Sequence, residues 1–228
     1  MDVAILQHAI YEGPGEIAEW AKLRGHAVAT HHLYRGDSLP ALADFDCLVV
    51  MGGEMNIYQY RDWPWLRPES ALIRSALGQG KRAIGICLGA QFIADVMGSR
   101  VFQNGEIELG WLPIAWTPES RAMFSELPSS STVLHWHGDT FGLPAGATRL
   151  ALSAGCPEQG FVIPGQCLGL QFHLEVDPVL VKEFVQGQSE WPKGQYVQTA
   201  ETILKEAAQH CDRNRQLLHG LLDRFVES

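Results

Sequence analysis

The amino-acid sequence predicts an α/β protein whose central sheet is mostly parallel and doubly wound, with helices covering both faces. Over the first two hundred residues, short β-type runs alternate with helical patterns, which is the order expected of such a sheet. Residues 47–51 (CLVVM) are continuously apolar, as a central strand buried on both faces requires. A long helical pattern closes the chain. We therefore expect a covered sheet with extra β-hairpins and a long C-terminal helix.

The expected strands and helices alternate in order along the first half of the chain. Strands are predicted at residues 3–7, 27–33, 47–51 and 82–86, and helices at 16–24, 69–77 and 88–97. Gly98 follows the last of these helices and suits a C-terminal cap. From residue 101 to residue 172 the signals shorten, with turn residues at Asn104-Gly105 and Ala145-Gly146. This pattern predicts strands in hairpins and one further strand that returns to the main sheet.

The last stretch, residues 199–226, carries apolar residues at a helical period and predicts one long amphipathic helix. The helix either packs on the domain, which we favour, or serves a partner or a second copy in a homo-oligomer. Residues 187–194 (GQSEWPKG) are linker-like but too short to define a second domain. We expect a single domain over residues 1–228, with a core at about 1–186 and a helical extension at about 195–228.

Composition and charge exclude several classes of function. Hydrophobic residues make up 46% of the chain and charged residues 19%, so a substantial core can be buried. The net charge is −9 and no run of basic residues occurs, which argues against nucleic acid as a partner. No eighteen consecutive residues are apolar, and Asp2 stands where a signal peptide would carry Lys or Arg. We therefore expect a cytoplasmic protein without a membrane partner.

The five cysteines, at positions 47, 87, 156, 167 and 211, include no CxxC pair and suggest neither a disulfide framework nor a zinc site. Cys87 differs from the others because Gly85-Ile86-Cys87-Leu88-Gly89 lies where an apolar strand meets a helix. Small flanking residues allow the sharp turn of a nucleophile elbow. The helix N-terminus would favour a thiolate. An imidazolium paired with this thiolate would bring the pKa of the thiol well below its ordinary value of about 8.5. The alternative is a buried cysteine beside two packing glycines.

His173 and Glu175 lie two residues apart in GLQFHLE, residues 169–175, and therefore share one face of a strand. A cysteine nucleophile needs a base, and the base needs an acceptor that fixes its tautomer. His173 and Glu175 supply these groups in order. Such a pair is commonly incidental when it occurs alone, but together with a cysteine elbow it predicts a Cys-His-Glu site.

Paired glycines end the central strand at Met51-Gly52-Gly53. Their backbone N–H groups, with the N–H of Leu88, would bind the oxyanion of a tetrahedral intermediate. Each such donor contributes roughly 3 kcal/mol of transition-state stabilisation. The alternative is a turn that needs positive φ.

The three motifs MGG, GICLGAQ and GLQFHLE, in this order and separation, resemble the class I glutamine amidotransferases, the type with a Cys-His-Glu site. The sequence is most similar to the glutaminase portion of GMP synthase and its stand-alone relatives, through motifs that span roughly residues 45–176. This resemblance implies a flavodoxin-like sheet. It also implies that Cys87 is the nucleophile, His173 the base and Glu175 its orienting partner. Gly53 and Leu88 would form the oxyanion hole.

The same resemblance implies the substrate-binding residues. Gln91, at the last position of GICLGAQ, would contact the substrate through its side-chain amide. Residues 134–139 (LHWHGD) match the family's His-Gly-Asp segment, whose backbone holds the amino-acid end of glutamine. Trp136, His137, Gly138 and Asp139 are therefore expected at the substrate.

Residue types alone would also allow His135 and His137 to be metal ligands, but no third ligand is evident in the sequence. We expect neither a metal nor an organic cofactor. Two positions depart from the family pattern: Glu54 follows the glycine pair and Leu174 follows His173, where Pro is common at both. Neither change removes a catalytic atom. Glu54 places a carboxylate near the oxyanion loop and would alter the strength or selectivity of substrate binding.

These features imply a hydrolase that cleaves the γ-amide of glutamine through a glutamyl thioester. A stand-alone hydrolase of γ-glutamyl peptides or amines would need the same site, and an inactive binding or regulatory protein of this fold is a further alternative. The 228 residues leave no room for a fused synthetase, so we expect either a separate synthetase subunit or no transfer of ammonia.

Two loops near the expected site stay without an assigned role. Residues 58–68, with Trp63 and Trp65, would form either a rim over the pocket or a loop pinned into the core. The EGPG loop at residues 12–15 ends the first strand and could face the pocket, but its sequence is too common in turns to support an assignment.

Overall fold

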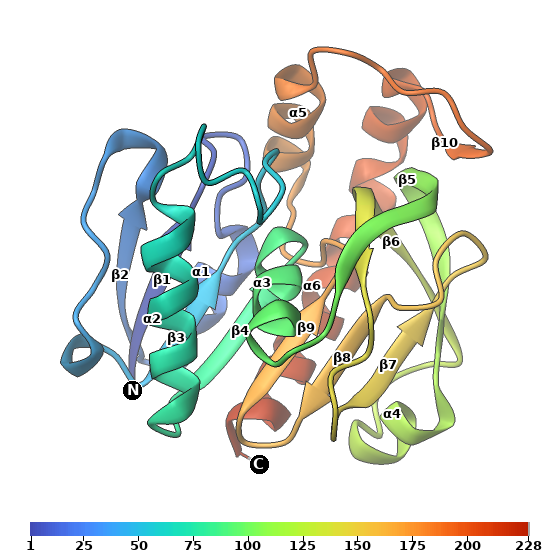
Figure 1. The fold of residues 1–228 in the computed structure, drawn as a ribbon. Coiled ribbons are helices and arrows are strands. Elements are labelled where there is room, and N and C mark those ends of the chain that lie inside the picture. The colour runs from blue at the N-terminus through green and yellow to red at the C-terminus, as the bar shows by residue number, and fades with distance from the viewer. Residues whose placement is uncertain (228) are drawn as a thin grey trace.

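The computed structural model describes residues 1–227, and these form a ten-stranded mixed sheet with helices on both faces (Figure 1). The strands are β1 (Asp2–Gln7), β2 (Ala27–His32), β3 (Cys47–Val50), β4 (Arg82–Ile86), β5 (Val101–Trp116), β6 (Ser130–Phe141), β7 (Thr148–Leu152), β8 (Gly160–Ile163), β9 (Cys167–Leu170) and β10 (Tyr196–Val197). The helices are α1 (Gly15–Leu23), α2 (Leu66–Gly78), α3 (Leu88–Val96), α4 (Pro118–Met123), α5 (Pro178–Gly187) and α6 (Ala200–Glu227), with 3₁₀ turns at Leu33–Arg35 and Leu42–Asp44.

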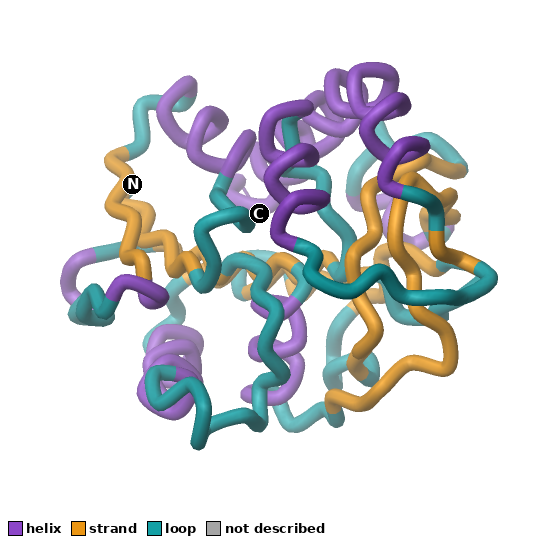
Figure 2. The backbone as a smooth tube through the Cα atoms, turned by 90° about the horizontal axis from the view of Figure 1, so that it is seen from above, coloured by secondary structure: helices purple, strands orange, loops and turns teal. Residues whose placement is uncertain are grey.

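Parallel pairing joins five strands in the order β2, β1, β3, β4 and β9. The middle strand, β3, is fully buried, and its side chains alternate between two hydrophobic clusters. Cys47 and Val49 pack with residues of α1 and α6, whereas Leu48 and Val50 pack with residues of α2 and α3. Figure 2 shows helices on either side of the strands. The predicted doubly wound α/β architecture is therefore confirmed.

The second part of the sheet is antiparallel apart from the short β10, which runs parallel to β5. β5 pairs with β6 along most of its length, and β7 and β8 link β5 to β9. β9 then runs parallel to β4, which confirms the predicted return to the main sheet. The prediction of a turn at Asn104-Gly105 is wrong, because these residues lie inside β5, where the pairing with β6 shifts between Gln103 and Glu108. A bulge absorbs the extra residues without ending the strand.

The bounds of helices α2 and α6 can be compared with those expected from the sequence. α2 begins at Leu66, before the predicted start at residue 69, because Pro68 is tolerated in the first helical turn, where its missing N–H would have no partner. α6 confirms the long C-terminal helix, and its apolar stripe is buried against the rest of the chain while Leu204 stays 42% exposed. The helix thus packs on its own domain.

No helix within residues 1–227 has both the length and the apolar character needed to cross a bilayer. The five cysteines are all free and buried.

Candidate active site

Cys87 occupies a strained turn between β4 and α3. Its φ of 49° makes it the one non-glycine residue with positive φ in the described part of the chain. This conformation is costly for a side chain and marks sites where the surrounding structure enforces it. A Cβ atom on Gly85 would overlap the backbone of Gly89, and one on Gly89 would overlap the carbonyl of Val50. Both glycines are therefore required for α3 to pack closely against β3 and β4 and hold this elbow.

His173 and Glu175 lie beyond the end of β9, behind the elbow. His173 Nδ1 lies 2.6 Å from Glu175 Oε1, and both side chains are 1% exposed. The backbone N–H of His173 donates to the carbonyl of Leu134 at 2.8 Å, which fixes the segment to β6. Burial lowers the pKa of His173, but the Glu175 carboxylate and the Cys87 thiol outweigh it, and the pKa lies well above its ordinary value.

The Cys87 thiol is buried, with 6% of the residue exposed. Burial raises the pKa of this thiol, and the opposing hydrogen bond and charge of His173 are smaller effects. The expected lowering of the pKa is therefore wrong for the site without substrate, because desolvation of the thiolate outweighs the imidazole and the helix N-terminus. The thiol still lies among polar groups, since Gln171 Nε2 donates to its Sγ at 3.4 Å.

The glycine pair after β3 passes beside the elbow. Leu88 is the first residue of α3, so its N–H has no partner within the helix. A Cβ atom on Gly53 would lie 2.9 Å from Leu88 Cδ2, which shows how closely the two predicted oxyanion donors approach. Below them, the buried His8 Nδ1 donates to the carbonyl of Gly52 at 2.9 Å and its Nε2 lies 2.7 Å from Glu69 Oε1. This pair holds the glycine loop from inside the protein.

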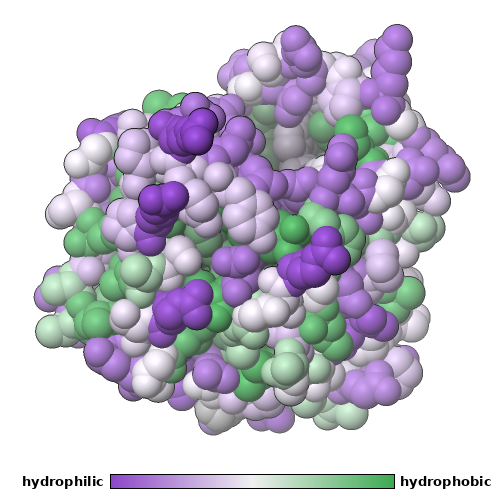
Figure 3. Space-filling view, viewed as in Figure 1, coloured by the Kyte–Doolittle hydropathy of each residue, from purple (hydrophilic) through white to green (hydrophobic). Residues whose placement is uncertain are grey.

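A cavity of about 530 Å³ opens over the elbow, and the surface in Figure 3 is hollowed beside α5. The residues of this cavity that the sequence pointed to are Gly53, Cys87, Leu88, Gln91, Trp136, His137, Gly138 and Asp139. His173 and Glu175 lie behind Cys87 rather than in the cavity wall. The structure thus brings all of the predicted site residues to the carboxyl ends of the central strands, where open α/β sheets bind ligands.

The segment Trp136 to Asp139 forms one side of the cavity. Trp136 packs edge-on against Phe184 of α5 at 5.5 Å between ring centroids, and its Nε1 donates to Gln188 Oε1 at 2.8 Å. Asp139 accepts a hydrogen bond from Asn56 Nδ2. These contacts tie the segment to both α5 and the loop after Gly53.

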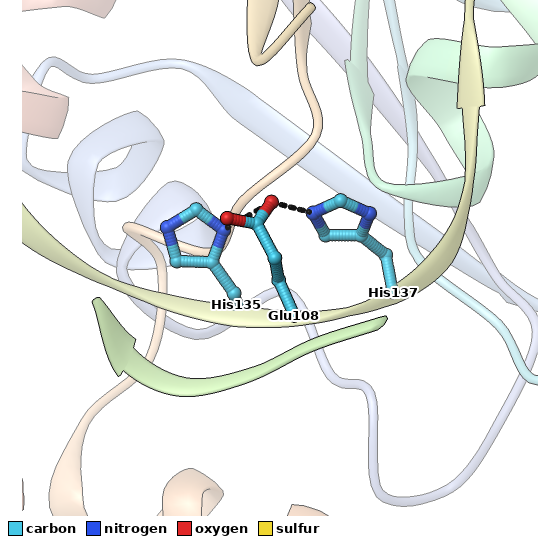
Figure 4. Close-up of side chains that lie close together, drawn as sticks. All are labelled: Glu108, His135 and His137. Carbon is cyan, nitrogen blue, oxygen red and sulfur yellow. Dashed lines mark ion pairs between the residues drawn. The ribbon is translucent and has the colours of Figure 1, made fainter. Parts of the chain in front are cut away.

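Glu108 of β5 joins His135 and His137 in a buried cluster that the sequence patterns did not reveal. Figure 4 shows the carboxylate between the two imidazoles. Glu108 Oε2 lies 3.1 Å from His137 Nε2 and 3.6 Å from His135 Nδ1. Within the described residues, this is the group of three that could hold a metal ion. Glu108 therefore supplies the third ligand that was not evident in the sequence. The shifted pairing of β5 with β6 brings it close to the two histidines.

Hydrogen bonds within the chain already occupy this carboxylate. Gln159 Nε2 donates to Glu108 Oε2 at 2.5 Å, and Ser153 Oγ donates to Oε1 at 2.6 Å. His137 Nδ1 donates to the carbonyl of Asp139 at 3.0 Å. These hydrogen bonds indicate that the cluster is a structural anchor. It fixes the Asp139 end of the cavity wall to β5.

Three further residues, Glu12, Glu54 and Gln188, line the cavity. Glu54 was expected near the oxyanion loop and the EGPG loop was expected to be able to face the pocket, but neither Glu12 itself nor Gln188 was predicted. The sequence signal that could have placed them at the site was their position: Glu12 and Glu54 follow the ends of strands, and Gln188 lies in the linker-like segment. Trp63 and Trp65 do not line it; they contact each other at 4.9 Å between ring centroids and pack against the core. Of the two interpretations of their loop, the structure therefore favours the pinned one.

Fold and site together define a class of α/β proteins built around a cysteine elbow at the carboxyl edge of a parallel sheet. The family described as "Glutamine amidotransferase class-I" matches residues 21–184, and the chain belongs to this family. The resemblance inferred from MGG, GICLGAQ and GLQFHLE is confirmed.

Known proteins similar to this chain agree. The glutamine amidotransferase-like protein YfeJ of Salmonella typhimurium is 34% identical over 234 residues, which cover 100% of this chain and 96% of YfeJ. A crystal structure of a glutamine amidotransferase from Thermotoga maritima has a TM-score of 0.89 and 30% identity, with 100% of this chain and 99% of that chain covered. The glutamine-hydrolysing GMP synthase of Dehalococcoides mccartyi is 27% identical over 169 residues, which cover 69% of this chain but 30% of that enzyme.

Proposed function

We propose that this protein hydrolyses the γ-amide of glutamine or a related γ-glutamyl compound with Cys87 as nucleophile, His173 as base and acid, and Glu175 as the group that orients His173. The observation that carries this proposal is the strained Cys87 elbow, which faces the cavity with the buried His173–Glu175 pair behind it. A thiol, an imidazole and a carboxylate in this sequence of contacts are the parts of a nucleophilic acyl-transfer site.

The reaction begins when Cys87 Sγ, having given its proton to His173, attacks the δ-carbonyl carbon. The carbonyl oxygen becomes an oxyanion, which the N–H groups of Gly53 and Leu88 stabilise. His173 then protonates the departing nitrogen, the carbon–nitrogen bond breaks, and a glutamyl thioester on Cys87 remains. His173 next removes a proton from water, which attacks the thioester and releases glutamate and the free thiol.

The substrate's amino-acid end is placed against Trp136, His137, Gly138 and Asp139, with the Gln91 amide beside the elbow. Gln91 Nε2 donates to Gln171 Oε1 at 3.2 Å, which orients it within the cavity wall. The reaction needs no metal or organic cofactor, because thiol, imidazole and backbone groups supply every step. Treatment with a chelator should leave turnover unchanged.

The fate of the leaving amine separates two forms of this proposal. A separate synthetase subunit would accept ammonia; the GMP synthase similar to this chain is named glutamine-hydrolysing. The alternative is a stand-alone γ-glutamyl hydrolase, and the cavity of about 530 Å³ leaves room for a leaving group larger than ammonia. An inactive binding protein would not need the strained elbow.

Glutamate release from glutamine, γ-glutamyl peptides and γ-glutamyl amines tests the proposal, with wild type and Cys87→Ala compared on each. We expect release by the wild type and none by the variant. Full turnover by Cys87→Ala would overturn the proposed site. Stimulation of glutamine hydrolysis by an added synthetase would support transfer of ammonia.

A further inference from the structure

Glu12 carries a buried carboxylate that faces the cavity and has no hydrogen-bond partner among residues 1–227. The residue is 7% exposed and lines the cavity wall. None of the hydrogen bonds formed among residues 1–227 reaches its side-chain oxygens, and its backbone N–H donates to the carbonyl of Ala9. A buried carboxylate without donors is costly unless it takes up a proton or pairs with a cation. Burial raises the pKa of Glu12 to about 7, even though the charges of His173 and His8 act to lower it.

The carboxylate lies beside the glycine loop and the imidazole of His173. A Cβ atom on Gly52 would overlap Glu12 Oε2 and would lie 3.3 Å from His173 Cε1. Glu12 is therefore next to both the oxyanion loop and the imidazole that delivers a proton to the departing nitrogen. Only the absence of a side chain at Gly52 allows this approach.

A second carboxylate extends the same side of the cavity. Glu54 is exposed and lines the cavity, and its Oε2 accepts a hydrogen bond from Tyr11 Oη at 2.7 Å. Its negative charge is among the causes that raise the pKa of Glu12, which places the two carboxylates close enough to repel each other. No Lys or Arg is among the residues that line the cavity within the described chain. The glutamyl end is assigned to other lining residues, Trp136 to Asp139.

We propose that Glu12 and Glu54 form a subsite for a cationic leaving group, so that the preferred substrates are γ-glutamyl amines whose leaving amine bears a second, protonated amino group. This inference rests on the proposed function. A second ammonium would supply the partner that Glu12 lacks and would lie between like-charged carboxylates. The amino acid released from a γ-glutamyl peptide carries a carboxylate, which both residues would repel.

Three substrates of matched length test the subsite: glutamate joined through its γ-carboxyl to 1,4-diaminobutane, to butylamine and to 4-aminobutanoate. Their leaving groups are cationic, neutral and anionic. We expect kcat/KM to fall in that order, with about tenfold or more between cation and anion. Glu12→Gln and Glu54→Gln should each reduce the ratio of cation to anion. Glu119→Gln, an exposed residue of α4 outside the cavity, makes the same charge change and should leave that ratio unaltered.

The outcomes separate the subsite from the proposed function. Equal or reversed kcat/KM values, with hydrolysis still abolished by Cys87→Ala, would overturn the subsite alone. An equal loss on all three substrates in Glu12→Gln would also overturn it, because Glu12 would then bind the common glutamyl group. Absence of hydrolysis on all three substrates and on glutamine would overturn the proposed function itself.

Discussion

Glu175 Oε1 lies 2.6 Å from His173 Nδ1, in a contact that is almost completely buried behind Cys87. Because a carboxylate only accepts hydrogen bonds, Nδ1 must hold the proton that it donates. The other ring nitrogen is then left to exchange a proton with the thiol. This contact fixes the tautomer on which the proposed chemistry depends.

Glu175→Gln should lower kcat by about 10²–10⁴-fold, the range that a correctly oriented acid–base group contributes. An amide can donate to Nδ1 and thereby favour the wrong tautomer. KM should change little, because Glu175 does not line the cavity. Steady-state kinetics measure both constants. Glu183→Gln, an exposed residue of α5, is the control; a Glu175→Gln enzyme as active as this control would contradict the orienting role.

Glu69→Ala should destabilise the protein by about 3–5 kcal/mol, because it leaves His8 buried without its partner. Both side chains of this pair are fully buried, and Glu69 raises the pKa of His8 against the lowering effect of burial. Urea unfolding of the variants measures the change. Glu19→Ala breaks an exposed pair with Lys22 and should cost less than about 1 kcal/mol. Equal losses in the two variants would show that the His8 pair does not stabilise the fold.

Gly89→Ala should destabilise the elbow by about 3 kcal/mol, since the added methyl group overlaps the carbonyl of Val50. Gly78→Ala is the matched control, because no atom lies within 4 Å of its added Cβ and its φ is ordinary. That control should change stability by less than about 1 kcal/mol. Thermal unfolding and glutamate release report on fold and site together. A Gly89→Ala protein with unchanged stability and activity would refute the close-packing argument.

The reactivity of Cys87 should keep rising with pH beyond the range in which an ordinary cysteine ionises, because burial raises the pKa of the Cys87 thiol. Alkylation by a small neutral reagent, followed by peptide mass spectrometry, measures the thiolate fraction. The charge of Glu12 contributes to the raised pKa, whereas His173 opposes it. Glu12→Gln should therefore shift the profile to lower pH. A plateau in the wild type at a lower pH than that of an ordinary cysteine, or a shift to higher pH in the variant, would contradict these directions.

The sequence predicted the elements that depend on local pattern. The apolar run of β3 and the period of α6 follow from residue order alone, and the motif around Cys87 contains the two glycines that the elbow requires. Where a local turn pattern competed with strand pairing, the tertiary structure determined which of them formed. Asn104-Gly105 has the residues of a tight turn, yet it lies within β5, because pairing with β6 continues on both sides of the bulge.

Contacts between distant residues could not be predicted in this way. Glu108 meets His135 and His137 through a shifted register that no local pattern encodes. Glu12 reaches the cavity because β1 and β3 are neighbours and Gly52 leaves space for its carboxylate. The pKa of Cys87 depends on burial, which the expected pairing of a thiolate with an imidazolium does not include.

The most direct test of the central claim is to trap the acyl-enzyme. Wild-type protein is mixed with the substrate it hydrolyses fastest, quenched in acid during turnover, digested and examined by mass spectrometry. We predict a glutamyl thioester on the peptide that contains Cys87, absent from Cys87→Ala and accumulating in a variant in which deacylation is slowed. Glutamate release by Cys87→Ala at the wild-type rate, or an acyl group on another residue, would contradict the account.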